Sequence, residues 1–247
     1  MRVAALYDIH GNLPALEAVL AEVERAGVDQ IVVGGDVFPG PLAKESLDLL
    51  LQLERPIHFI RGNGDRVVLG QMRGHEPTEV PEQFRADIRW NAAQLSRDHE
   101  RIIAGWPETM QLLIEGLGSV LFCHASPRND TDIFTRQTPD ERLTALFTGI
   151  DADLVICGHT HMQFDRKVGA VRVINAGSVG MPYGDPGAYW LLLGPAVELC
   201  KTEYDLARAA EHIRKTAYPH VDFAATVIVQ PPSELAARET WAKAGAS

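Results

Sequence analysis

Short runs of apolar residues, each followed at once by glycine or a polar residue, recur along the first two thirds of the chain. Five of these runs read RVAALY, QIVVGG, IHFIRG, SVLFC and LVICG, and they cover residues 2–7, 30–35, 57–62, 119–123 and 154–158. Short continuous runs rich in Val, Ile and Leu are typical of strands that are buried on both faces of a sheet. The pattern therefore predicts five buried strands.

Helical periodicity separates the first three of these runs. Residues 13–25 carry apolar side chains at three- and four-residue spacing and end before Gly27, and residues 46–53 supply a second helix. Strands that alternate with helices indicate a parallel sheet. The first 63 residues are therefore expected to fold as βαβαβ.

The rest of the chain changes character. Residues 65–108 are expected to be a helical insertion, in which a polar loop is followed by helices over 84–94 and 98–106. Hairpins are predicted over 110–124 and 164–174, a further strand pair over 189–201, and helices over 140–147, 204–215 and 234–244. We expect these strands to form a second sheet packed on the first, within one domain that comprises residues 1–247.

Composition narrows the class of protein. The chain has 247 residues, 46% of them hydrophobic, and a formal net charge of −10. No nucleic-acid-binding surface is expected, because such a surface needs clustered Lys and Arg, although divalent cations among the carboxylates would still admit an anionic substrate. The three cysteines lack CxxC spacing and indicate free thiols in a reducing compartment. No run has the length of a membrane span or a signal-peptide core, so the sequence predicts a soluble cytoplasmic protein without a membrane partner.

Seven side chains that can bind a metal stand at or just past the ends of the five apolar runs. They are Asp8, His10, Asp36, Asn63, His124, His159 and His161. In open α/β sheets ligands bind beyond the carboxyl ends of the strands, where side chains distant in sequence can converge. Mixed His, Asp and Asn ligation suits first-row transition metals such as Mn, Fe, Ni or Zn better than Ca or Mg. The chain has enough such ligands for two divalent ions.

Each motif alone is weak evidence for a metal site. The two-residue spacing of Asp8 and His10, and of His159 and His161, lets both members of a pair reach one ion, but such pairs also arise by chance. A lone histidine is more often a satisfied core or surface residue. Glycines beside the GGD, GN and GHTH ligands permit the tight turns that a crowded site needs. The combination of motifs favours a metal centre.

The motifs taken together resemble the calcineurin-like metallophosphoesterases. They are DIH at 8–10, GGD at 34–36, GNGD at 62–65, CH at 123–124 and GHTH at 158–161, in the order of the family. HASPR at 124–128 and NAGSVGMP at 175–182 are most similar to the small prokaryotic phosphodiesterase-type branch. The resemblance covers roughly residues 1–200 and implies an α/β fold, a four-layer α/β/β/α sandwich of two mixed sheets.

The same resemblance implies a binuclear centre. Asp8, His10, Asp36 and His161 would hold one ion, and Asp36, Asn63, His124 and His159 the other, with Asp36 as the bridge. Mn is favoured among Mn, Fe, Ni and Zn. Such a pair of ions can activate a hydroxide nucleophile and neutralise phosphoryl oxygens, so catalytic roles are expected for Asp36, His10 and Asn63. The implied activity is hydrolysis of phosphodiesters or nucleotide-like phosphoanhydrides, and the expected partner is a small phosphorylated substrate.

The chain departs from the protein phosphatases of this superfamily. These carry GDxxDRG and GNHE, whose second Asp and His together protonate the leaving group, whereas this chain has Pro39 and Gly64 there. A substrate that needs little protonation is therefore expected, such as an aryl or nucleotidyl ester. Arg128 in HASPR is the candidate phosphate clamp and a further catalytic residue, against the alternative of a solvated or structurally paired arginine. Trp90 in the insertion either offers an aromatic face to the substrate or packs in the core.

Further residues beside the motifs are candidates for supporting roles. Arg61 and Arg66 flank GNGD, and structural roles are favoured for both. Asn175, Gly177 and Ser178 are expected to shape a turn that orients His161. A phosphomonoesterase acting on small molecules, a non-catalytic scaffold of the same fold and a protein with one structural ion are the alternative functions. The presence of all seven ligands favours the enzyme, and the oligomeric state has no signal in the sequence.

Overall fold

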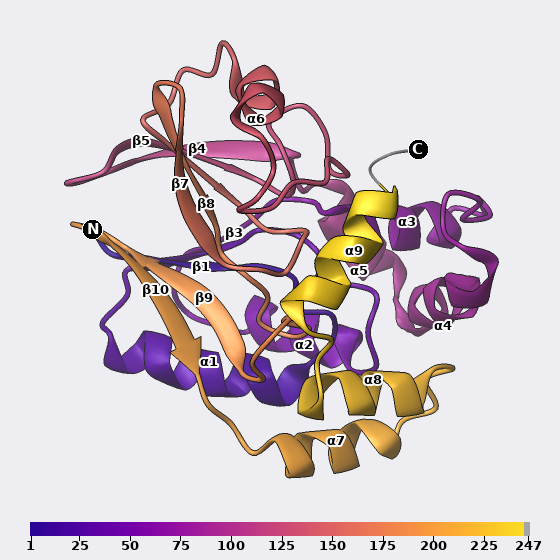
Figure 1. Cartoon of the computed structure of the whole chain (residues 1–247). Coiled ribbons are helices and arrows are strands. Elements are labelled where there is room, and N and C mark those ends of the chain that lie inside the picture. Colours follow the sequence, from indigo (N-terminus) through magenta and orange to yellow (C-terminus); the bar gives the residue numbers. More distant parts are fainter. Residues whose placement is uncertain (245–247) are drawn as a thin grey trace.

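The computed structural model describes residues 1–244, which contain two five-stranded sheets (Figure 1). The first sheet has the order β10-β9-β1-β2-β3. Its strands are β1 (Val3–Leu6), β2 (Gln30–Val33), β3 (Ile57–Phe59), β9 (Ala188–Leu193) and β10 (Val197–Thr202). The first three strands are parallel, as the βαβαβ pattern predicts, while β9 lies antiparallel to β1 and β10 antiparallel to β9.

The second sheet has the order β4-β5-β6-β8-β7. Its strands are β4 (Thr109–Ile114), β5 (Gly118–Cys123), β6 (Leu154–Cys157), β7 (Phe164–Val168) and β8 (Val171–Asn175). The neighbours β5, β6 and β8 are parallel, and a hairpin adds an antiparallel strand at each edge. Both sheets are therefore mixed, and the carboxyl ends of β5 and β6 lie at one edge of the second sheet.

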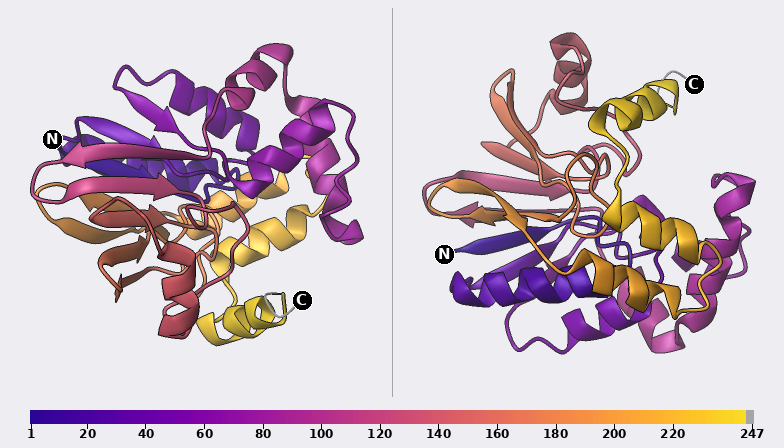
Figure 2. Two further views of the ribbon diagram at one scale, coloured as in Figure 1. Left: turned by 90° about the horizontal axis from the view of Figure 1, so that it is seen from above. Right: turned by 60° about the horizontal axis from the view of Figure 1, so that its bottom comes forward.

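Two helices cover the first sheet and one covers the second. Helices α1 (Leu13–Arg25) and α2 (Ala43–Leu51) pack on the first sheet, and α6 (Asp140–Phe147) packs on the second. The remaining helices are α3 (Asn63–Met72), the 3-10 turn η1 (Glu82–Phe84), α4 (Arg85–Gln94), α5 (Arg97–Ala104), α7 (Leu206–Arg214), α8 (Val221–Val229) and α9 (Glu234–Ala244). Helices α3, α4, α8 and α9 gather at the end of the sandwich that lies away from the N-terminus (Figures 1 and 2).

Successive residues of a strand alternate between two apolar cores, which explains the layers of the fold. In β1, Ala4 and Leu6 pack in the core beneath α1 and α2, whereas Val3 and Ala5 belong to the core between the sheets. Alternate residues of β6 likewise divide between the core between the sheets and the core beneath α6. A strand covered on both faces reads as a continuous apolar run, which is the pattern that predicts these strands. The four-layer α/β/β/α sandwich of two mixed sheets is thus confirmed.

Three expectations about the elements are wrong. The strand pair at 189–201 joins the first sheet through β9 and β1, because β9 is apolar on both faces and periodicity does not specify which sheet such a strand joins. Residues 63–72 form α3 instead of a loop, and their short apolar stretch at Val67–Leu69 is too brief to show a helical period. Helix α8 lies where no element is predicted, since VDFAATVIV is rich in residues that also suit strands.

The structure bears on two further predictions, that the cysteines are free thiols and that no segment has the length of a membrane span. Cys123 and Cys157 are buried and Cys200 is half-buried, and all three are free thiols. Burial raises the pKa of each of these thiols, which disfavours the reactive thiolate. Every helix within residues 1–244 is too short or too polar to cross a lipid bilayer.

Candidate metal centre

All seven predicted ligand residues lie at the carboxyl ends of strands, where the two sheets meet. Asp8 and His10 follow β1, Asp36 follows β2, Asn63 begins α3 after β3, His124 follows β5, and His159 and His161 follow β6. We call these seven residues the metal centre. They come from five strands in two sheets, so the fold brings together residues that are up to 153 positions apart, from Asp8 to His161.

The backbone of the metal centre is unusual. Asp8, His10, Asp36, His159 and His161 have φ angles of 53°, 46°, 54°, 66° and 57°, and they are the only non-glycine residues with positive φ among residues 1–244. A left-handed conformation at a residue with a side chain costs about 1–3 kcal/mol and persists only where the surroundings enforce it. Backbone hydrogen bonds from the nitrogens of Asp8 and His10 to the neighbouring loop supply part of that enforcement. Strain concentrated in five candidate ligands is typical of a functional site.

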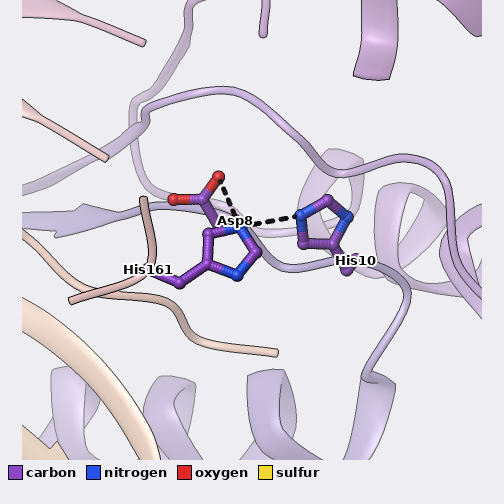
Figure 3. Close-up of side chains that lie close together, drawn as sticks. All are labelled: Asp8, His10 and His161. Atoms are coloured by element: carbon purple, nitrogen blue, oxygen red, sulfur yellow. Dashed lines mark hydrogen bonds and ion pairs between the residues drawn. The ribbon is translucent and has the colours of Figure 1, made fainter. Parts of the chain in front are cut away.

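The first group of ligand atoms comprises Asp8, His10 and His161 (Figure 3). The distance from Asp8 Oδ1 to His161 Nε2 is 3.4 Å, and the Nε2 atoms of His10 and His161 lie 3.3 Å apart. Asp36 Oδ2 approaches this group from the side, 3.7 Å from His10 Nε2. Three different loops therefore point four ligand side chains at one small space.

The second group lies around His124, whose Nε2 atom is 3.5 Å from Asp36 Oδ2 and 3.8 Å from Asp8 Oδ1. The inner atom of the Asn63 amide lies 3.0 Å from His124 Nε2 and 3.0 Å from His159 Nδ1. With the amide oxygen turned inward, these three atoms form a second set of candidate metal ligands. Asp8 and Asp36 both reach this set as well as the first one.

Hydrogen bonds orient three of the histidines. The Nδ1 atom of each is paired with a backbone carbonyl, so its Nε2 atom faces the centre. The carbonyls are Pro39 O at 3.1 Å from His10, Gly34 O at 2.9 Å from His124 and Met181 O at 2.7 Å from His161. An imidazole that donates from Nδ1 presents an unprotonated Nε2, which is the form that binds a metal.

These contacts fit a divalent cation. Asp8 Oδ1 is buried and has no hydrogen-bond partner within the described part of the chain. The facing Nε2 atoms of His10 and His161 would be two lone pairs at 3.3 Å when both rings are neutral. A buried carboxylate oxygen without a hydrogen bond and two opposed lone pairs are costly alone, and a cation between them satisfies all three.

The pKa shifts of the histidines in the metal-free protein also indicate a cation site. Burial disfavours the charged form of His124, but Asp36 and Asp8 outweigh it and raise the pKa of His124 to about 10. Burial and the neighbouring His124 lower the pKa of His159 to about 4. Burial also opposes the charge of His161, yet Asp8 raises its pKa. A proton on His124 therefore balances the buried carboxylates in the place where a metal would act, and Asp8 favours a proton on His161 in the same way.

Asp65 is a supporting residue that sequence reasoning missed. Its buried carboxylate accepts hydrogen bonds from the backbone nitrogens of Asp36 at 2.8 Å, Phe38 at 3.1 Å and Gly62 at 2.9 Å. Burial and the charge of Asp36 raise the pKa of Asp65 to about 7. Asp65 thus ties the loop that carries Asp36 to the start of α3. An acidic residue three positions after Gly62, at a helix start, is the signal that indicates this role.

The NAGSVGMP segment supports the centre as expected. Asn175 Nδ2 donates to Gly158 O at 2.6 Å, in the loop that carries His159 and His161. Ser178 Oγ donates to Asp8 O at 2.7 Å and accepts from Met181 N at 2.7 Å. Met181 O in turn accepts from His161 Nδ1, so one serine hydroxyl links two ligand loops.

Ser178→Ala is expected to weaken metal binding by about 10- to 100-fold, because partners that orient metal ligands typically contribute that much. The substitution removes both hydrogen bonds of the hydroxyl while changing little volume at this buried position. Metal titration of the stripped protein measures the effect. Ser119→Ala, at the opposite end of β5 from His124, is the matched control and should bind metal like the parent. Equal affinities for both variants would contradict the supporting role of Ser178.

The three arginines have different outcomes, and the structural roles favoured for Arg61 and Arg66 agree with their ion pairs. The structure does not bring Arg128 to the metal centre, and its side chain is exposed. Ser126 Oγ accepts a hydrogen bond from Arg128 N and closes the turn at this motif. Arg61 pairs with Glu108. Arg66 is the arginine that lines the cleft beside the metal centre, where Asp130 accepts from its guanidinium at 2.6 and 3.3 Å.

A cleft of about 490 Å³ opens from the metal centre, and its lining includes His10, Asp36, Asn63, His159 and His161. This volume is within the range of small-molecule sites. Trp90 does not line the cleft but packs edge-on against Tyr218, with ring centroids 5.4 Å apart. Trp90 is half-buried and lies outside the apolar cores of the described residues, so it neither lines the cleft nor belongs to the core.

The sequence of the chain is similar to a known family and to known proteins. A model of the calcineurin-like phosphoesterase superfamily domain matches residues 1–193. An uncharacterized protein of Methanocaldococcus jannaschii is 28% identical over 242 residues, which cover 88% of this chain and 93% of that protein. The phosphodiesterase YfcE of Escherichia coli is 24% identical over 202 residues, which cover 78% of this chain and 87% of YfcE.

A solved structure supports the same assignment. A metallophosphoesterase from Sphaerobacter thermophilus superposes with a TM-score of 0.73 at 28% identity, covering 94% of this chain and 99% of that chain. The family is metal-dependent, and candidate ligands for a metal lie together here. Since the family model spans residues 1–193 and includes all seven residues of the metal centre, the chain belongs to the calcineurin-like phosphoesterase superfamily.

Proposed function

We propose that the protein is a phosphoesterase that hydrolyses phosphodiesters or nucleotide-like phosphoanhydrides at a two-ion metal centre. One observation supports this most strongly. Asp8 and Asp36 both lie within 3.8 Å of His124 Nε2, while Asp8 also faces His161 and Asp36 also faces His10. Carboxylates shared between two sets of histidines suit two neighbouring cations better than one structural ion.

The proposed ligands follow the family pattern. One ion is assigned to Asp8, His10, Asp36 and His161, and the other to Asp36, Asn63, His124 and His159. Asp36 is the proposed bridge because it holds that place in the family pattern and its Oδ2 faces histidines of both sets. Manganese is the proposed metal among Mn, Fe, Ni and Zn, all of which can bind mixed imidazole and carboxylate ligands. When bound, the ions supply Lewis-acid activation of water and neutralise charge on the phosphoryl oxygens. YfcE, a relative by sequence, is named a phosphodiesterase, which favours this reaction class.

Backbone hydrogen bonds hold the two carboxylates in the proposed orientation before a metal binds. Gly64 N donates to Asp36 Oδ1 at 2.7 Å, which leaves Oδ2 to face the histidines. His159 N donates to Asp8 Oδ2 at 2.9 Å, which leaves Asp8 Oδ1 to face inward. Each carboxylate therefore has one oxygen fixed by the backbone and the other free for a cation, which lowers the cost of reorganisation on binding.

No leaving-group acid stands at the two phosphatase positions. Pro39 has no titratable side chain and its carbonyl accepts from His10, while Gly64 donates its backbone nitrogen to Asp36. His10 is held on one ring nitrogen by Pro39 and faces ligands with the other, so its proposed role is that of a ligand. The centre should therefore favour substrates whose leaving groups need little protonation.

An aryl phosphodiester is expected to turn over at least about 100-fold faster than a phosphoserine peptide, since general-acid assistance contributes that much to a poor leaving group. Steady-state kinetics with bis(p-nitrophenyl) phosphate and a phosphoserine peptide, at equal metal loading, provides the ratio. Similar kcat/KM values for the two substrates would contradict the proposed preference. A panel that adds an aryl monophosphate and a dinucleoside polyphosphate distinguishes the phosphodiesterase from a phosphomonoesterase.

Metal loading at pH 7 is expected to release about one to two protons per chain, because ligands must lose their protons to bind a metal. The pKa of His124 is raised to about 10, so His124 is charged at pH 7 in the metal-free protein, and the pKa of His161 is raised as well. The apparent metal affinity should therefore increase as pH rises toward these values. Calorimetry in two buffers with different ionisation enthalpies counts the protons. A count of zero at pH 7 would refute this titration scheme.

A further inference from the structure

The cleft has a second half that lies beyond the metal centre and is mainly apolar. Two segments provide it, one from the region around α4 and one from the C-terminal helices. We call these residues the apolar wall: Val80, Pro81, Phe84, Ile88, Ile213, Tyr218, Phe223, Ala224, Ile228 and Trp241. The last six belong to residues 206–244, outside the 1–193 match to the family model. This half of the cleft is therefore built largely by a part of the chain that the family model does not cover.

Packing places the two segments of the apolar wall side by side. The rings of Phe84 and Phe223 have centroids 6.4 Å apart, and Trp90 supports Tyr218 from behind. Residues of α7 and α8 form a core with Leu42, in which Ile213 and Ile228 are almost fully buried. The apolar wall thus rests on a packed helix pair instead of an isolated loop.

Trp241 joins the apolar wall to the metal centre. Its ring centroid lies 5.5 Å from that of His159, and it is carried by α9, which rises from α8 toward α6 (Figures 1 and 2). A group attached to a phosphate at the metal centre would therefore meet the apolar wall directly.

Several polar groups near the apolar wall already have partners, whereas Trp241 Nε1 is buried without a hydrogen-bond partner among the described residues. Both oxygens of the buried Asp87 carboxylate lie 2.9 Å from His220 Nδ1, and Tyr218 also bonds this carboxylate. At the rim, Arg66 pairs with Asp130 and Glu79. A sugar or a nucleobase buried here would lose most of its hydrogen bonds to water without replacement, which is costly, whereas an apolar group would lose none.

We infer that the apolar wall seats an uncharged apolar group, aryl or alkyl, of the phosphoester whose phosphate lies at the metal centre. This inference rests on the proposed function for the position of the phosphate. Residues 206–244, and Phe223 in particular, then determine substrate preference. Phe223 lines the cleft and is 51% exposed, so a ligand can cover much of its ring and an exchange to alanine leaves the core intact.

Binding of phosphonates tests the inference without requiring turnover. Methyl-, butyl-, hexyl- and phenylphosphonate share one head group, and calorimetry with metal-loaded protein gives their dissociation constants. Each methylene that leaves water should tighten binding by about two- to fourfold, so hexylphosphonate should bind at least about tenfold more tightly than methylphosphonate. Phenylphosphonate should also exceed methylphosphonate, whereas a phosphonate that carries a nucleoside should bind no more tightly than methylphosphonate.

Two variants locate the effect. Phe223→Ala should reduce the preference for the hexyl and phenyl compounds by about tenfold and leave methylphosphonate unchanged. Leu113→Ala, which removes an 80% exposed side chain from β4 far from the cleft, should leave the whole series unchanged. Equal affinities along the series, a preference for the nucleoside, or no binding of any phosphonate would overturn the inference. A steep series in a protein that hydrolyses no phosphoester would retain the apolar site and reject the proposed function.

Discussion

Asp36→Asn is expected to lower kcat/KM for an aryl phosphodiester by at least about 1,000-fold, because metal ions supply several kcal/mol of transition-state stabilisation and each 1.36 kcal/mol is a factor of ten. Asp36 Oδ2 lies 3.7 Å from His10 Nε2 and 3.5 Å from His124 Nε2, so it faces both proposed sets of ligands. The amide keeps the shape of the carboxylate but removes the charge and reduces its ability to bridge two cations. Kinetics at saturating metal, together with metal content, measures the loss.

The control for this variant is Asp98→Asn. Asp98 lies on α5, its side chain is 74% exposed and its partner is Arg101 one turn along the helix. The exchange removes the same charge from the surface and should change kcat/KM by less than about twofold, since surface ion pairs contribute little. An Asp36→Asn enzyme that keeps parental kcat/KM would refute the bridging role.

Gly158→Ala is expected to damage the fold and the metal centre together. An added Cβ would lie 2.5 Å from Asp8 Oδ2 and 2.5 Å from Tyr7 Cδ1, in the buried space between the sheets. Overpacking of this kind costs about 1–3 kcal/mol, which lowers the Tm of a chain of this size by about 2–12 °C. Displacement of Asp8 should also weaken metal binding by about 10- to 100-fold. Thermal unfolding with and without metal gives both effects.

Gly70→Ala is the matched glycine control. Gly70 lies within α3, and an added Cβ would have only His75 Cβ near it, at 3.9 Å. Because glycine is unfavourable inside a helix, the exchange should stabilise the protein by up to about 1 kcal/mol and leave metal binding unchanged. A Gly158→Ala protein with parental Tm and metal affinity would mean that the loop after β6 can move aside at no cost.

Much of the fold can be predicted from the sequence, because a buried strand appears as a short continuous apolar run. The five apolar runs predict β1, β2, β3, β5 and β6, and the polar residues that end them are the metal centre. A single topological rule, that ligands gather at the carboxyl ends of strands, therefore predicts the convergence of Asp8 with His161 across 153 positions. The five left-handed ligands show why glycines flank these positions, since the loops turn sharply there.

The rest depends on contacts that have no local signature. β9 is apolar on both faces, so its pairing with β1 instead of the second sheet is decided by the whole core. Helix α8 is stabilised by its packing against α7 and by the core around Leu42, not by its own periodicity. Arg128 is in a motif but its side chain is exposed, whereas Arg66 reaches the cleft because α3 forms where a loop is expected. Likewise the apolar wall joins segments around Phe84 and Phe223 that are unrelated in sequence.

The most direct test of the proposed two-ion metal centre is the number of metal ions per chain, measured together with turnover. The purified protein would be stripped of metal and titrated with Mn, Ni, Zn or Mg, with ion content and hydrolysis of bis(p-nitrophenyl) phosphate followed at each step. We expect two ions per chain at saturation, with turnover that follows the binding of the second ion. One tightly held ion per chain, or two ions without turnover for any of these metals, would contradict this expectation.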